Sequence, residues 1–176
     1  MNEAHLHLAV NHFPIITPFI GLLILAGGYF YKAPALIRAA YVLFMLSAVF
    51  TLIAMLTGEG AEEIVENIGG VSHDYIEVHE ESAELFSTFS YVLGIISLVA
   101  LWCDLKNKSY QKYILLVVVG WAAITLYVAK LTGTSGGEIR HTEIRSNMSL
   151  IDNHSGEAEE GEHEEKRKEE DEHDEH

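Results

Sequence analysis

The stretch AAYVLFMLSAVFTLIAML, residues 39–56, decides the fold class. It contains no charged side chain, and a helix needs roughly 17 to 25 apolar residues to cross the hydrocarbon layer of a membrane. Three further uncharged apolar runs have similar lengths, at residues 13–31, 85–102 and 113–129. Four such runs in 176 residues leave no polar face for a water-soluble core. We therefore predict an all-α integral membrane protein with four transmembrane helices.

We expect the first helix to remain in the mature protein, because no basic region precedes it and no small-residue cleavage site follows it.

Charge divides the chain into two parts. The formal net charge is −15, and residues 151–176 account for −10 of it, with 13 acidic residues against two lysines and one arginine. This low-complexity segment is rich in Glu and His and has no apolar face to bury. We therefore predict a transmembrane domain at residues 1–145, followed by a disordered acidic tail at residues 146–176.

Basic residues orient the predicted helices. The connections between the first and second runs and between the third and fourth runs carry Lys32, Arg38, Lys106, Lys108 and Lys112. The long connection at residues 57–84 has nine acids and no Lys or Arg. Because cytoplasmic loops of membrane proteins are enriched in Lys and Arg, we expect the basic connections to be cytoplasmic and both termini to be outside.

All histidines that precede the tail fall in segments predicted on the outer side. They are His5, His7, His12, His73, His79 and His141. Imidazole binds metals and exchanges protons near neutral pH. Their restriction to one face indicates a site there. The chain has no phosphate-binding loop, nucleophile elbow or basic patch for nucleic acid, so these classes of function are not predicted.

The sequence also contains an internal repeat. The segments MLTGEGAEEI, residues 55–64, and KLTGTSGGEI, residues 130–139, share Leu-Thr-Gly, a later Gly and a closing Glu-Ile. The repeat predicts a four-helix bundle of two tandem helical hairpins, each ending in Thr-Gly at the outer face. We expect Gly58 and Gly133 to end their helices and to let a backbone or a flat ligand come close to the histidines.

Three motifs resemble a known family. HLAVNHFPI at residues 7–15, His79 before the third apolar run and TGTSGGEI at residues 132–139 are similar to a bacterial family of four-helix membrane proteins, the domain of unknown function twenty-two thirty-one. The resemblance covers about residues 5–141. It implies a bacterial inner membrane protein with four spans, and it hints at electron transfer because some members occur with c-type cytochrome domains.

Haem b is the cofactor that best suits these histidines. Imidazole is a common axial ligand, and bundle cores hold cofactors between side chains of facing helices. We predict His12 and His79 as the paired axial ligands, because both stand at the entrance of a hairpin, and His7 and His141 as groups at the outer mouth. With both axial positions filled, the haem would carry electrons, so we expect an electron carrier or subunit more than a stand-alone enzyme.

Two other functions remain open. The outer face mixes imidazole and carboxylate groups, which suit a transition metal ion for binding or transport. The alternative ligand set is His5, His7, His73, Glu59 and Glu62. The protein could also be a structural subunit without a cofactor, since small residues on the spans favour close helix packing. In each case the acidic tail could dock a basic partner, such as a c-type cytochrome, through long-range attraction.

Overall fold

The computed structural model describes residues 2–66 and 73–145, and these residues contain helices and no strand. The helices are α1 (Glu3–Val10), α2 (Phe13–Phe30), α3 (Pro34–Glu66), α4 (His73–Leu105), α5 (Gln111–Glu138) and the short 3-10 helix η1 (Thr142–Ile144). The chain divides into two compact units, Met1–Arg140 and His141–His176, and all five α-helices belong to the first. The all-α prediction is confirmed, while the predicted tail at residues 146–176 lies outside the described residues.

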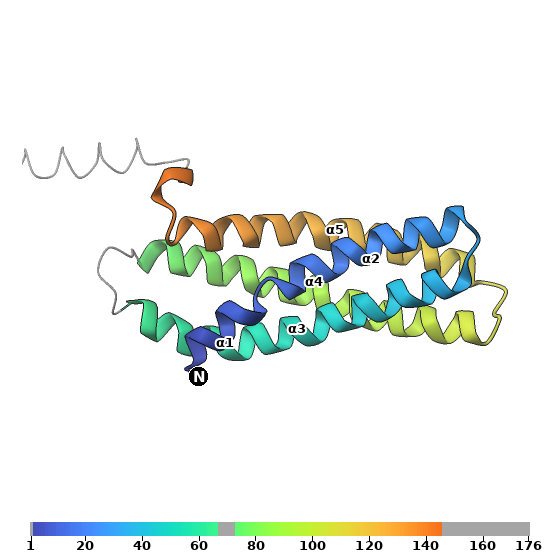
Figure 1. Cartoon of the computed structure of the whole chain (residues 1–176), viewed down its shortest axis with the longest axis horizontal. Coiled ribbons are helices and arrows are strands. Elements are labelled where there is room, and N and C mark those ends of the chain that lie inside the picture. The colour runs from blue at the N-terminus through green and yellow to red at the C-terminus, as the bar shows by residue number, and fades with distance from the viewer. Residues whose placement is uncertain (1, 67–72, 146–176) are drawn as a thin grey trace, which may run out of the picture. The chain divides into compact units, whose positions relative to one another are not determined.

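The first unit is a four-helix bundle made of two hairpins. Helix α2 packs along α3, α4 packs along α5, and α3 and α4 join the hairpins, while α1 lies against α3. Figure 1 shows that α1, the ends of α3 and α5 and the start of α4 meet at one end of this bundle. We call it the histidine end. The opposite end holds the connections at residues 31–33 and 106–110 and is called the lysine end.

Both connections at the lysine end turn in the same way. Lys32 and Asn107 adopt the left-handed conformation, with φ of 51° and 49°. Lys32 precedes Asn107 by the same number of residues as Thr57 precedes Thr132, so the two hairpins repeat in backbone conformation as well as in sequence. The predicted tandem hairpins are therefore confirmed.

Four helical segments are long and apolar enough to cross a membrane. They are Glu3–Phe30, Pro34–Val65, His73–Leu105 and Gln111–Glu138. Helix α3 has 33 residues, about 50 Å of helix at 1.5 Å per residue, which exceeds the roughly 30 Å of the hydrocarbon core. The helices therefore continue past the apolar runs from which they were predicted, and the acidic residues on α3 and α4 extend the bundle at the histidine end.

Gly58 and Gly133 do not end their helices, so this prediction is wrong. Both lie inside continuous helices, because α3 runs on to Glu66 and α5 to Glu138. A glycine inside a helix costs only about 1 kcal/mol relative to alanine. The residues that follow Gly58 include Ala and Glu, which are good helix formers and outweigh that cost.

A break separates α1 from α2. Pro14 has no N–H to donate to the carbonyl of Val10, and proline disfavours helical conformation in the residue before it. Helix α1 accordingly ends at Val10, His12 caps the N-terminus of α2, and Pro14 occupies the first turn of α2. The segment before α2 forms a separate helix that packs on α3 and runs on along it, since Phe13 stacks on Phe50 and His7 contacts Ala54 and Thr57.

The polarity of the interior changes along the bundle. Towards the lysine end it is an apolar core, formed by Leu25, Ala40, Tyr41, Phe44, Leu93, Ala100, Val118 and Ala122. The buried polar side chains of the described residues are all Ser or Thr: Ser47, Thr51, Thr57, Ser87, Ser90, Ser97, Thr125, Thr132 and Ser135. Except for Ser97, they lie between the middle of the bundle and the histidine end, where they share the interior with a second, smaller apolar cluster of Phe86, Val128 and Ala129.

Ser47 satisfies a backbone carbonyl that proline leaves without a donor. Pro18 lies inside α2 and cannot donate to the carbonyl of Pro14 one turn earlier. The buried Ser47 hydroxyl on α3 donates to this oxygen at 2.8 Å. In a bilayer no water can replace such a bond, so neighbouring helices must supply it.

We expect Ser47→Ala to destabilise the bundle by about 1–3 kcal/mol, the cost of an unsatisfied buried polar group. Unfolding in detergent measures this effect. In a Pro18→Ala background the new N–H can bond to the Pro14 carbonyl, so the same Ser47→Ala change should cost clearly less. Equal costs in both backgrounds would show that the Ser47 bond does not compensate for Pro18.

Candidate functional site

His7 is held on α3 by its Nδ1 atom. This nitrogen lies 3.0 Å from the carbonyl oxygen of Ala54 and 3.3 Å from Oγ1 of Thr57. A carbonyl oxygen can only accept, so Nδ1 carries the ring proton and Nε2 keeps its lone pair. The His7 ring is half-buried, and a Cβ at Gly58 would lie 3.9 Å from its Cε1 atom. The prediction that Gly58 lies beside a histidine is therefore correct.

His79 is held in a similar way between α4 and α5. Its Nδ1 atom lies 3.1 Å from Oγ of Ser135. The Ser135 hydroxyl donates to the carbonyl of Thr132 at 3.0 Å, which leaves its oxygen to accept from Nδ1–H. Oγ of Ser82 lies 2.7 Å from Oγ of Ser135, and Thr132 donates to the carbonyl of Ser82 at 2.8 Å. These hydroxyl groups hold the Nδ1 side of the His79 ring between α4 and α5.

Gly136, and not Gly133, lies against His79. A Cβ at Gly136 would lie 2.9 Å from Cε1 and 3.2 Å from Nδ1 of His79, whereas a Cβ at Gly133 would meet Cδ1 of Ile15 at 3.5 Å. Three residues advance a helix by about 300°, so the two glycines point in directions about 60° apart. The predicted role of Gly133 at the site therefore belongs to Gly136.

The structure distinguishes His12 from His7 and His79, because the His7 and His79 side chains are partly buried and His12 is exposed. His7 is held against α3, and His79 is held between α4 and α5. His12 is exposed and its side chain makes no capping hydrogen bond. The physical reason is the break before Pro14, which places His12 at the outer start of α2 and turns α1 so that His7 faces α3. The pairing of His12 with His79 stays a prediction.

His141 belongs to the second unit and is described by itself. Its ring is exposed, and Nδ1 lies 2.8 Å from Oε1 of Glu143. The backbone N–H of Glu143 and this contact with His141 lower the pKa of the Glu143 carboxyl group. The predicted role of His141 at the outer mouth stays a prediction.

The alternative metal ligands do not gather into one group. His5 and His73 are exposed, Glu59 is exposed and Glu62 is partly exposed. The backbone N–H of His5 donates to Oδ1 of Asn2, which caps α1. Within residues 2–66 and 73–145, no three His, Cys, Asp or Glu side chains are placed to hold a metal ion.

Four residues of the site were not predicted from the sequence. Ser82 and Ser135 follow His79 and Thr132 by three residues, the helical spacing that puts side chains on one face, so this pattern could have indicated them. Gly136 follows Thr132 by four residues, which is also a spacing that puts residues on one helix face, so it could have been indicated in the same way. Asn11 follows His7 by four residues, and its buried Oδ1 atom has no hydrogen-bond partner in the described part of the chain.

No protein-family model, curated protein or solved structure matches the chain. The resemblance to the bacterial four-helix family therefore stays a prediction that depends on the three motifs quoted above.

Proposed function

We propose that the protein is a membrane-embedded haem b protein for electron transfer, with His7 and His79 as the two axial ligands. The observation that carries this proposal is the fixed Nδ1 atom of both rings, at 3.0 Å from Ala54 and 3.1 Å from Ser135. Histidines that bind metals usually donate their other ring N–H to a protein acceptor, which orients the ring and raises its basicity. His7 and His79 both have this arrangement.

The number of available ligands favours haem over a bare metal ion. A protein-bound zinc, copper or iron ion needs three or more protein ligands, whereas porphyrin supplies four nitrogens and requires only the axial groups from the protein. The described residues offer two fixed imidazoles and no group of three metal ligands. When bound, the haem would supply one-electron chemistry, and two imidazoles would leave no open position for oxygen.

The half-polar interior supports a site at one face rather than a path through the membrane. Ser and Thr hydroxyls line the bundle from its middle to the histidine end. Beyond them, Leu25, Phe44, Leu93 and Val118 are almost completely buried and fill the interior towards the lysine end. A group bound near His7 and His79 would thus exchange electrons with partners at the histidine end.

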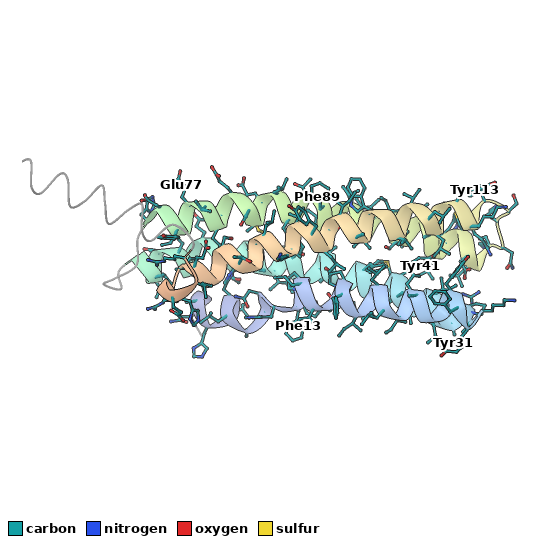
Figure 2. All side chains as sticks on the ribbon, turned by 90° about the horizontal axis from the view of Figure 1, so that it is seen from above. Phe13, Tyr31, Tyr41, Glu77, Phe89 and Tyr113 are labelled. Carbon is teal, nitrogen blue, oxygen red and sulfur yellow. The ribbon has the colours of Figure 1, made fainter. Side chains whose placement is uncertain are left out.

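The proposed orientation places the histidine end on the outer side of a bacterial inner membrane. The lysine end carries Lys32, Lys106 and Lys108, and basic segments remain cytoplasmic. Glu77 lies at the end opposite Tyr31 and Tyr113 (Figure 2). We propose that this acidic end and the tail attract a basic redox partner such as a c-type cytochrome, because opposite charges accelerate association at low salt.

An absorption spectrum of the purified protein tests the function. The full chain, extracted from membranes in mild detergent, should show a low-spin haem spectrum that dithionite reduces, with about one haem per chain, as expected for two axial imidazoles. The same preparation should not bind carbon monoxide while both axial ligands are in place. Protein that neither contains haem nor acquires a low-spin spectrum with added haemin would contradict the proposal.

A further inference from the structure

The lysine end combines exposed aromatic rings with lysines that lie over them. Trp102, Tyr110 and Tyr113 have exposed fractions of 51%, 45% and 61%. Nζ of Lys108 lies 5.5 Å from the centre of the Trp102 ring, and Nζ of Lys112 lies 5.0 Å from the centre of the Tyr113 ring. Tyr31 and Tyr113 both lie at this end of the bundle, on opposite sides of it in the view of Figure 2. The end of α4 and the start of α5 thus carry lysines whose ammonium groups lie over exposed aromatic rings.

The single acid of this region is already paired. Asp104 is the only acidic residue in the segments 31–38 and 103–112. Its Oδ2 atom lies 2.6 Å from Nε of Arg38, which joins the start of α3 to the end of α4. Among residues 2–66 and 73–145, no ion pair involves Lys106, Lys108 or Lys112. These three charges remain available to an anionic partner.

We propose that this surface, formed by Trp102, Lys106, Lys108, Lys112 and Tyr113, binds the phosphate headgroups of anionic phospholipids. Trp102 ends an apolar run of the chain, and Trp and Tyr at such positions lie at the level of the headgroups. The group that meets the lysines at this level is a lipid phosphate. Cation–π contact holds an ammonium group in place without cancelling its charge. This inference is independent of haem binding.

The chain offers a built-in probe for the test. It has two tryptophans, and Trp121 is stacked on Phe89 with its Nε1 bonded to the Phe89 carbonyl at 3.0 Å. In a Trp121→Phe variant, the remaining fluorescence comes from Trp102. This variant is reconstituted into bilayers that contain brominated phosphatidylglycerol or brominated phosphatidylcholine at equal fractions, because bromine quenches tryptophan only at close contact.

We expect phosphatidylglycerol to occupy the sites around Trp102 several-fold more strongly than phosphatidylcholine, and high salt to weaken the preference. Each lysine near the surface contributes roughly a fivefold preference for anionic lipid. Lys108→Gln should therefore lower the preference for phosphatidylglycerol around Trp102 by about fivefold. Lys130→Gln changes an exposed lysine on α5 that lies towards the histidine end, and it should have no effect.

Three outcomes would overturn the proposal. One is equal quenching by both lipids in the Trp121→Phe protein. Another is an equal loss of preference in Lys130→Gln and Lys108→Gln. The third is displacement by inorganic phosphate beyond the effect of sodium chloride at the same ionic strength, which would assign the surface to a free anion. If Trp121→Phe does not fold, the lipids retained by the otherwise unchanged chain are identified by mass spectrometry, with and without Lys108→Gln. Equal retention of phosphatidylglycerol by both proteins would then overturn the proposal.

Discussion

Replacing either His7 or His79 by alanine should abolish haem retention, whereas replacing His12 should leave it nearly intact. Loss of a group that only supports a metal ligand typically lowers affinity by about 10–100-fold, so loss of an axial imidazole should lower it by more than about 100-fold. His7 and His79 are the histidines whose Nδ1 atoms are held by α3 and α5. His12 is exposed at the cap of α2.

The measurement is the haem content and reduced spectrum of each purified variant. Any haem that stays bound to the His7→Ala or His79→Ala protein should be five-coordinate and should bind carbon monoxide. His5→Ala is the matched control on α1, because His5 is exposed and only its backbone N–H is used in the cap. A low-spin spectrum that survives His7→Ala but is lost in His12→Ala would restore the pair predicted from the sequence and would contradict the pair proposed from the structure.

The four-helix fold could be predicted because one energy term dominates it, the transfer of apolar side chains out of water. Uncharged runs such as residues 39–56 leave water whatever their neighbours are, so their number and length determine the helices. The lengths of the helices could not be predicted in the same way. Helix α3 continues through Gly58 to Glu66 because the helix propensity of the acidic segment, and not its hydropathy, decides where it ends.

Which histidine is buried depends on the direction of α1, and a pattern along the sequence does not contain that direction. Spacing from the start of α2 favours His12, since it stands where the chain becomes apolar. Pro14, however, starts a new helix. The direction of α1, which precedes this break in the chain, is decided by its packing on α3. That packing buries His7 against Ala54 and Thr57, a contact between residues far apart in sequence.

The repeat was visible in the sequence, but it did not reveal which groups hold each histidine. The shared Thr-Gly places Thr57 beside His7 and Thr132 beside Ser82, so the hydroxyl group of the repeat supports both halves of the site. Ser82 in turn lies 2.7 Å from Ser135, whose oxygen contacts His79. The two halves thus achieve the same fixed Nδ1 atom through different partners, a carbonyl in one and a serine in the other. Sequence identity between the repeats does not reveal this difference.

Gly136→Ala should displace His79 and weaken haem binding by about 10–100-fold, the range seen when support of a metal ligand is lost. The added Cβ would stand 2.9 Å from Cε1 and 3.2 Å from Nδ1 of His79, closer than side-chain atoms normally approach. Because Gly136 lies in the continuous helix α5, the imidazole has to move. Its 3.1 Å bond to Ser135 is then lengthened or lost, and the bundle loses about 1–3 kcal/mol of stability through overpacking.

Gly120→Ala is the matched control, because it makes the same change on the same helix at a position with no side chain within 4 Å. Alanine favours the helix by about 0.5–1 kcal/mol over glycine, so Gly120→Ala should keep haem and unfold at the same or a slightly higher temperature. Haem transfer to an excess of apomyoglobin gives the dissociation rates, and unfolding of the haem-free proteins in detergent gives the stabilities. If Gly136→Ala released haem no faster than Gly120→Ala, the close approach of α5 to His79 would have no role in binding. If it lowered only the stability of the haem-free protein, Gly136 would serve packing alone.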